Sequence, residues 1–151
     1  MCARENLPKL GYKKRIHLMN PLIPGLGKTG KMTSSDPLSK IDFDDSDDLI
    51  KQKLMNAYSR DGSRVHANCL LSLIKYVVFP FLDGPFELLR EEKYGGNKYY
   101  YNFEELEDEF ANDLVGSLDL KINLIPAIIK IVSPIRELIQ TQHQELSKQA
   151  Y

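Results

Sequence analysis

The sequence predicts a mostly α-helical fold from about residue 47 onward, and two observations support this. Apolar side chains recur there every three or four residues in several successive segments, which is typical of helices that bury one face. Residues favoured at helix starts precede two of these segments: Asn102, with a glutamate three positions on, and Ser133, followed by Pro134. Residues 24–35 combine glycines, lysines and hydroxyl side chains without apolar periodicity, so they are predicted to form a loop.

Length and composition limit the organisation of the chain and the kind of partner it binds. With 151 residues it fits one domain, or a small domain plus part of another. Its 42% hydrophobic and 27% charged residues are ordinary for a soluble globular protein. Because the formal net charge is only −1, a nucleic-acid partner would be bound through local patches and base contacts rather than an overall basic field.

The two cysteines, Cys2 and Cys69, predict neither a disulfide framework nor a metal site. Cys69 lies in an apolar run and is expected to be a buried thiol. The N-terminus has no apolar stretch of a secretory signal, and the longest apolar runs are far short of a membrane span. We therefore expect a cytoplasmic location and no membrane partner.

The first third of the chain is predicted to be irregular. Residues 1–15 are interpreted as the end of a helix or a loop, and Arg15–Met19 as a short strand ended by the prolines that follow. Residues 33–48 become acidic and are interpreted as a solvated loop that ends in a helix N-cap. They are not a calcium loop. Counted from Asp42, the sixth and twelfth positions hold Asp47 and Lys53, whereas a calcium loop needs Gly and Glu there.

The remaining chain is predicted to contain a succession of helices with one pair of extended segments. Pro126 is expected to kink a helix or shorten its start, and Ser133–Pro134 to begin a separate last helix that frays after Gln142. The expected helices cover 49–58, 70–81, 103–114, 118–132 and 135–146, and the extended segments 86–89 and 98–101 flank a turn at 94–97. The stripe predicted to be buried in the fourth helix is Leu118, Ile122, Ile125, Ile129 and Val132.

The glycine-rich loop is suited to phosphate oxygens and has two competing interpretations. Gly25 to Lys31 matches the first seven positions of the P-loop pattern, but the eighth is Met32, which lacks the hydroxyl that binds Mg²⁺. Pro37 follows closely, so no helix is expected after the loop. In the second interpretation, residues 31–35 are a variant of the KMSKS loop of class I aminoacyl-tRNA synthetases.

The segments around the loop favour the second interpretation. His17–Leu26 before it and Ser39–Asp42 after it resemble the tyrosyl-tRNA synthetases of eukaryotes and archaea. Farther on, Leu89–Asn97 resembles the EK-aromatic-GGN segment of this family. Asp119–Lys121 and Pro134–Glu137 match its DLK and PIRE segments in order and spacing. The resemblance covers the chain from about Leu10 to Leu138.

The resemblance implies that residues 1–46 are the C-terminal end of a Rossmann-like class I catalytic domain. In this family the loop closes over ATP and stabilises the pyrophosphate leaving group, and Lys31 matches the lysine involved. Ser34 stands where bacterial members have a second lysine, so that charge must come from elsewhere, such as Lys28, Mg²⁺ or a monovalent cation. The resemblance thus implies catalytic roles for Lys31 and Ser34. The positions it implies for ATP binding are Met19, Ile23, Lys28, Lys31, Met32, Thr33, Ser34 and Ser35.

The resemblance further implies that residues 47–151 form an α-helical anticodon-binding domain. Tyr94 matches the aromatic residue that stacks on the first anticodon base, a guanine. Asp119 matches the aspartate that accepts hydrogen bonds from the Watson–Crick edge of that guanine. A histidine is frequent three positions before this aspartate, but here the position holds Gly116.

Part of the family's machinery is not found in this sequence. An HxGH-type motif is absent, since His17, His66 and His143 are isolated. We therefore expect a C-terminal portion of a tyrosine–tRNA ligase that is inactive alone and belongs to a homodimeric enzyme acting on ATP with Mg²⁺, tyrosine and tRNA(Tyr). The alternative is a tRNA-binding or protein-interaction module that has lost catalysis, and a P-loop NTPase ranks third.

Overall fold

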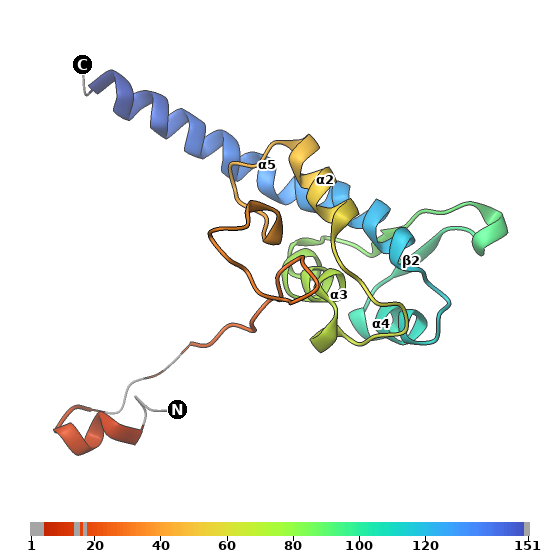
Figure 1. Cartoon of the computed structure of the whole chain (residues 1–151), viewed down its shortest axis with the longest axis horizontal. Coiled ribbons are helices and arrows are strands. Elements are labelled where there is room, and N and C mark those ends of the chain that lie inside the picture. Colours follow the sequence, from red (N-terminus) through yellow and green to blue (C-terminus); the bar gives the residue numbers. More distant parts are fainter. Residues whose placement is uncertain (1–4, 14–15, 17, 150–151) are drawn as a thin grey trace.

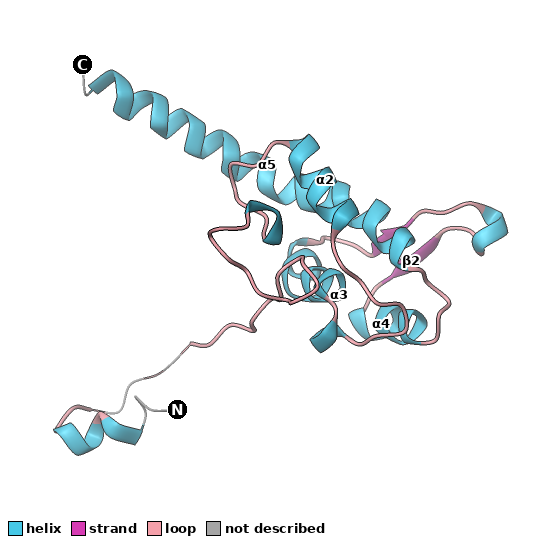
Figure 2. Ribbon diagram, viewed as in Figure 1, coloured by secondary structure: helices cyan, strands magenta, loops and turns pink. Residues whose placement is uncertain are grey.

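The computed structural model describes residues 5–13, 16 and 18–149, with side chains up to Gln142. It is mostly helical, with one small hairpin, as the sequence predicts (Figures 1 and 2). The helices are α2 (Asp47–Asn56), α3 (Cys69–Leu73), α4 (Phe103–Ala111) and α5 (Ser117–Gln149), and the strands are β1 (Phe86–Leu88) and β2 (Lys98–Tyr100). No helix in the described part of the chain is long and apolar enough to cross a membrane.

The longest element, α5, runs along α2, and its C-terminal part extends beyond the other elements (Figure 1). Its buried apolar positions follow a four-residue spacing that faces the core: Leu120, Leu124, Ile128 and Val132. Two polar contacts also join α5 to α2. Arg136 Nη2 lies 2.8 Å from Asp47 Oδ1, and Lys121 Nζ donates to the backbone oxygen of Met55 at 2.9 Å.

The prediction of two helices in this region is wrong, because α5 is continuous through both Pro126 and Pro134 and reaches Gln149. An internal proline costs about 3 kcal/mol, which burial of a continuous apolar face can exceed. The predicted stripe is also displaced: Leu118 and Ile122 are 56% and 51% exposed. Apolar residues occupy more than one face at the start of α5, so periodicity alone does not identify the buried one.

The local predictions for the middle of the chain are confirmed. The expected helix over 70–81 is a continuous helical run made of α3, a π-helical segment and a 3-10 turn. Strands β1 and β2 pair antiparallel, with Phe86 opposite Tyr100. Asn102 caps α4 by accepting a hydrogen bond from the backbone N–H of Glu105 at 2.9 Å.

The predicted strand at Arg15–Met19 is wrong where the structure describes it. Ile16, Leu18 and Met19 belong to no strand and are 99%, 95% and 82% exposed. Arg15 and His17 lie outside the described residues. A strand is stable only when a neighbour accepts its backbone hydrogen bonds, and within the described residues only β1 and β2 pair.

The acidic segment before α2 is only partly solvated, contrary to prediction. Ser46 caps α2, as expected, by accepting from the backbone N–H of Leu49 at 3.3 Å. Asp45, however, is buried and pairs with Lys53 of α2 at 2.6 Å, with side-chain exposures of 7% and 1%. Asp45 Oδ2 also accepts from the backbone N–H of Asp42 at 2.8 Å. This ion pair therefore attaches the acidic segment to the helical core.

Cys69 is buried as predicted, and its chemistry is testable. Burial raises the pKa of its thiol to about 11, and Sγ lies 3.3 Å from the backbone oxygen of Tyr58. At pH 8 we expect the native chain with Cys2→Ser to react with iodoacetamide far more slowly than the urea-unfolded chain, because the thiolate is the reactive form. Equal rates in the two states would show that Cys69 is accessible and ionised in the native fold.

Candidate functional site

The glycine-rich loop, residues 24–35, folds back on itself at its start. The backbone N–H of Gly25 donates to the oxygen of Gly30 at 2.9 Å. A Cβ atom on Gly25 would lie 2.6 Å from the backbone oxygen of Lys31, so only glycine fits there. Gly30 has a φ of +65°, in the left-handed region that favours glycine. These contacts give residues 25–31 a defined turn.

The chain closes at the base of this loop between Leu26 and Ser39, and Leu26 is also bonded to Tyr58, which follows α2. Leu26 is 3% exposed, donates from its backbone N–H to Ser39 at 2.9 Å, and accepts from the N–H of Tyr58 at 2.7 Å. The hydroxyl of Ser39 donates to the oxygen of Asp36 at 2.7 Å and accepts from the N–H of Thr33 at 3.1 Å. The residues between Leu26 and Ser39 are exposed.

The structure brings most of the predicted ATP-binding residues together on this exposed loop: Lys28, Lys31, Met32, Thr33, Ser34 and Ser35. Met19 and Ile23 do not join them. Met19 is 82% exposed in the preceding extended segment, and Ile23 packs against the hydrophobic core. The loop is followed by a turn and a short 3-10 helix, Pro37–Ser39, rather than the helix that a P-loop requires.

A second candidate site lies at the turn of the hairpin. Tyr94 ends a 3-10 turn, and its side chain is 62% exposed. Gly95 and Gly96 follow with φ values of +102° and +69°, which side-chain-bearing residues rarely adopt. The ammonium of Lys93 lies 4.8 Å from the centre of the Tyr94 ring. The turn therefore presents an aromatic ring to solvent on a backbone that requires the two glycines.

Asp119 lies in the first turn of α5, next to this hairpin. Its side chain is 24% exposed, and Oδ2 lies 3.6 Å from Arg90 Nη1 and 3.4 Å from the backbone N of Gly116. Asn123, one helical turn on, donates to the oxygens of Asp119 and Leu89 and accepts from the N–H of Leu89. These contacts hold the hairpin against the start of α5, so the predicted residues Tyr94 and Asp119 lie on two elements that are joined.

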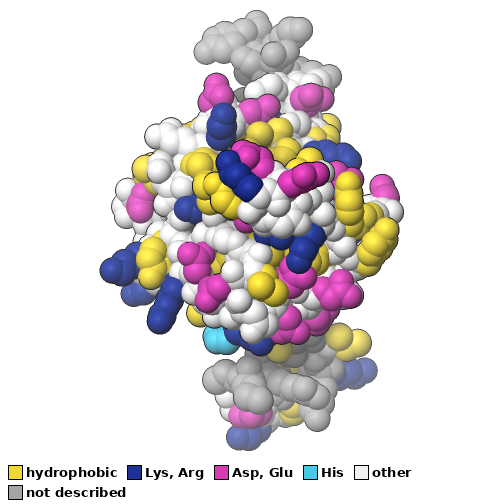
Figure 3. Space-filling model, turned by 90° about the vertical axis from the view of Figure 1, so that its right-hand side faces the viewer, with side chains coloured by type: hydrophobic (Ala, Val, Ile, Leu, Met, Phe, Trp, Pro, Cys, Tyr) yellow, Lys and Arg dark blue, Asp and Glu magenta, His cyan; other side chains and the backbone are white. Residues whose placement is uncertain are grey.

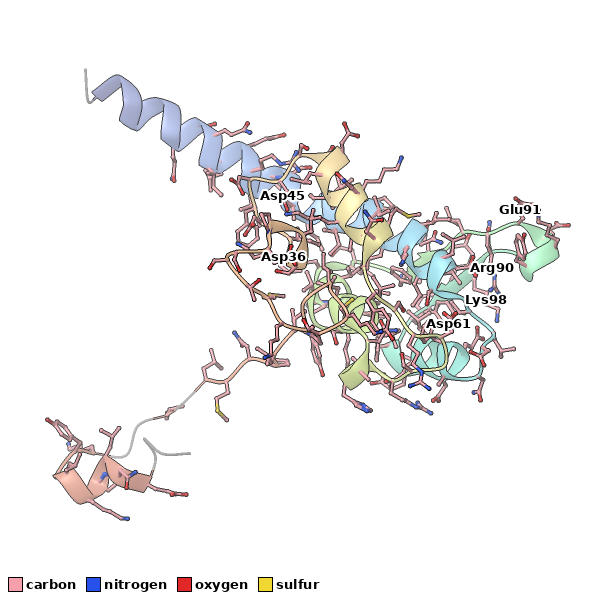
Figure 4. All side chains as sticks on the ribbon, in the orientation of Figure 1. Asp36, Asp45, Asp61, Arg90, Glu91 and Lys98 are labelled. Carbon is pink, nitrogen blue, oxygen red and sulfur yellow. The ribbon has the colours of Figure 1, made fainter. Side chains whose placement is uncertain are left out.

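Arg90 and Asn123 were missed as functional candidates. Arg90 belongs to the motif that ends in the two glycines, and Figure 4 shows it in the hairpin region near Lys98. Asn123 lies within the apolar stretch of α5, where a polar residue indicates a buried hydrogen-bonding role. Both could have been noticed in the sequence, but their partners are set only by tertiary contacts.

The charges around the hairpin are largely paired. Glu109 accepts from Lys98 Nζ and from the Tyr100 hydroxyl, both at 2.6 Å. Burial acts to raise the pKa of Glu109, but these two hydrogen bonds outweigh it and the pKa is lowered. Burial and the bond to Glu109 raise the pKa of Tyr100. Seen from the hairpin side, basic and acidic side chains are interspersed (Figure 3), which favours specific contacts over a broad phosphate-binding patch.

The two sites offer hydrogen-bond donors, a hydrogen-bond acceptor and an aromatic ring. Among the described side chains, which end at Gln142, no group of three or more His, Cys, Asp or Glu residues could hold a metal ion. The loop offers ammonium and hydroxyl donors to phosphate oxygens. The hairpin and the start of α5 offer an aromatic face and a carboxylate to an exposed base.

Comparisons with known proteins give one consistent result. Residues 1–133 match the family model "tRNA synthetases class I (W and Y)". The chain is 48% identical to the cytoplasmic tyrosine–tRNA ligase of Xenopus laevis over 99% of its own length and 28% of that protein. It is 38% identical to the tyrosine–tRNA ligase of Natronomonas pharaonis over its full length and 44% of that protein.

A solved structure supports the same family relationship. The tyrosyl-tRNA synthetase of Archaeoglobus fulgidus, crystallised with L-tyrosine, superposes with a TM-score of 0.79 at 34% identity, covering 89% of this chain and 41% of that one. The chain thus spans well under two thirds of the length of the relatives it matches.

Proposed function

Because this chain belongs to the class I tRNA synthetases for tryptophan and tyrosine, and within them to the tyrosyl type of eukaryotes and archaea, we propose that it supplies two parts of a tyrosine–tRNA ligase. Residues 1–46 contribute the loop that acts on ATP and pyrophosphate. Residues 47–151 form the anticodon-binding domain. The complete enzyme, a cytoplasmic homodimer in this proposal, attaches tyrosine to tRNA(Tyr) through tyrosyl-adenylate.

The first part of the proposal concerns the glycine-rich loop. The substrate is ATP with Mg²⁺ on its phosphates. A carboxylate oxygen of tyrosine attacks the α-phosphorus, the bond to the β-phosphate oxygen breaks, and pyrophosphate leaves with the electron pair. The ammonium of Lys31 stabilises the charge that develops on pyrophosphate, with Lys28 as a second cation and Ser34 as a hydroxyl donor. Support comes from the exposure of all three side chains on one loop that is closed by the hydrogen bond between Leu26 and Ser39.

The second part concerns the hairpin and the start of α5. Tyr94 stacks on the first anticodon base, and the carboxylate of Asp119 accepts from N1–H and N2–H of a guanine at that position. The observation that carries this assignment is that Arg90 contacts both Gly96, two residues after Tyr94, and Asp119, while Asn123 of α5 bonds Leu89 of the hairpin. Adenine and the pyrimidines lack guanine's pair of donors, so the carboxylate discriminates against them.

The test is the effect of Asp119→Ala on binding of short anticodon stem-loops that carry guanine or cytosine at the first anticodon position. We expect the affinity for the guanine stem-loop to fall by about 1–3 kcal/mol, while the cytosine stem-loop is little affected. Fluorescence anisotropy measures both. Asp83→Ala removes the same charge from an exposed residue and should leave both affinities unchanged. Equal losses on the two stem-loops would contradict guanine recognition by Asp119.

A further inference from the structure

We propose that Arg90 is the positioning residue of the anticodon site, which places the Tyr94 turn and the Asp119 carboxylate relative to each other; this rests on the function proposed above. Its guanidinium touches both halves of the site. Nε donates to the backbone oxygen of Gly96 at 2.9 Å, and Nη1 lies 3.6 Å from Asp119 Oδ2. One side chain therefore connects the stacking element and the hydrogen-bonding element.

The hydrogen bonds of Arg90 fix its guanidinium in one orientation. Besides Gly96, Nη1 donates to the backbone oxygen of Leu114 at 2.9 Å, just before α5 begins. The backbone N–H of Arg90 donates to the side-chain oxygen of Asn97 at 2.9 Å, across the turn. Arg90 thus contacts residues on both sides of the turn and the chain before α5. These contacts use the planar, multi-donor geometry of arginine, which lysine cannot reproduce.

Gly95 shows that the fit between Arg90 and the turn is close. A Cβ atom on Gly95 would lie 2.8 Å from Arg90 Nη2 and 3.4 Å from Cζ. The left-handed backbone of Gly95 favours glycine, and a Cβ atom there would also displace the guanidinium. The second glycine, Gly96, supplies the carbonyl that Arg90 binds.

Burial makes the pairing of Arg90 with Asp119 significant. The Arg90 side chain is only 5% exposed, so its positive charge is largely removed from water and must be compensated by nearby acceptors. The Asp119 carboxylate, 24% exposed, supplies the opposite charge at Oδ2, where the N–H of Gly116 also points. The carboxylate is thereby held in one orientation while remaining accessible to a base.

The consequence is a base preference that depends on a residue which does not touch the base. Without the guanidinium, Tyr94 can still stack, because stacking tolerates small changes of position and any base. Two hydrogen bonds to the guanine edge tolerate far less displacement. Loss of Arg90 should therefore reduce the preference for guanine more than it reduces binding as such.

The experiment compares Arg90→Gln, Arg90→Lys and Arg64→Gln in the full chain. Arg64 is the matched control, since it pairs with Asp108 at 2.6 Å on α4 and removing it changes the net charge equally. Affinities for the guanine and cytosine stem-loops are measured by anisotropy, and amide hydrogen exchange is followed at Gly95 and Gly96. We expect Arg90→Gln to lower the guanine-to-cytosine affinity ratio on the order of tenfold and to accelerate exchange at the two glycines. Arg90→Lys should restore only part of the ratio.

The outcomes separate this proposal from the one it rests on. Suppose that Asp119→Ala lowers the guanine-to-cytosine affinity ratio but Arg90→Gln leaves it unchanged. This result overturns the role of Arg90 and leaves guanine recognition by Asp119 intact. Full restoration by Arg90→Lys, or unchanged exchange at Gly95 and Gly96, also overturns it. A parent chain that shows no guanine preference refutes the proposed function, and the inference about Arg90 with it.

Discussion

Replacing Asp45 by alanine is expected to lower the free energy of unfolding by about 3–5 kcal/mol, because it leaves a buried ammonium without its partner. The Lys53 side chain is 1% exposed and lies 2.6 Å from Asp45 Oδ2. Asp45 also accepts from the N–H of Asp42, which would lose this bond. Urea denaturation followed by circular dichroism measures the change.

Two further variants test whether the loss of stability comes from the unpaired buried charge. The double substitution Asp45→Leu with Lys53→Met removes both charges and should be far less destabilising than Asp45→Ala, since no buried charge is left unpaired. Lys40→Ala breaks a solvent-exposed pair with Asp42 and should be far less destabilising than Asp45→Ala. If Asp45→Ala costs no more than Lys40→Ala, the Asp45–Lys53 pair is accessible to water in solution.

Substitution of Lys31 by alanine is expected to have the largest effect on catalysis. We consider a chimera in which this chain replaces the matching segment of the Xenopus laevis relative. The chimera should catalyse tyrosine-dependent ATP–pyrophosphate exchange, and Lys31→Ala should slow it about 10²–10³-fold, because an ammonium at the developing pyrophosphate charge acts mainly in the transition state. The chain alone should give no exchange.

The controls use the other lysines of the same region. Lys28→Ala should slow exchange less than Lys31→Ala, and Lys9→Ala, an exposed position before the loop, should not slow it. A chimera that binds the guanine stem-loop but shows no exchange, with Lys31 intact, would instead favour a tRNA-binding module without catalysis. Unchanged exchange with Lys31→Ala would refute the role given to this lysine.

The sequence predicts the local structure well where single residues determine it. Asn102 caps α4 and Ser46 caps α2, because a cap depends on a side chain and a backbone N–H two or three residues away. The hairpin follows from a glycine turn between two short apolar segments. The exposed loop with its lysines follows from composition alone.

The features that the sequence does not predict depend on contacts between distant segments. Nothing local distinguishes Asp45 from the acidic residues around it, and only the approach of α2 buries it. Arg90 has one hydrogen-bond partner six residues away and another twenty-four residues away. Pro126 predicts an interrupted helix, yet packing along the whole of α5 keeps it continuous.

The hydrogen bond between Leu26 and Ser39 has a consequence for the energetics of the glycine-rich loop. Because Leu26 and Ser39 already meet, residues 27–38 form an Ω-loop. The entropy of bringing these two residues together is therefore lost when the chain folds, not when a ligand binds. Of the loop's own conformational entropy, only the part lost by ordering the exposed residues then opposes binding. A loop of this kind can thus change conformation when a ligand binds without loosening the helical part of the chain to which Leu26 is bonded.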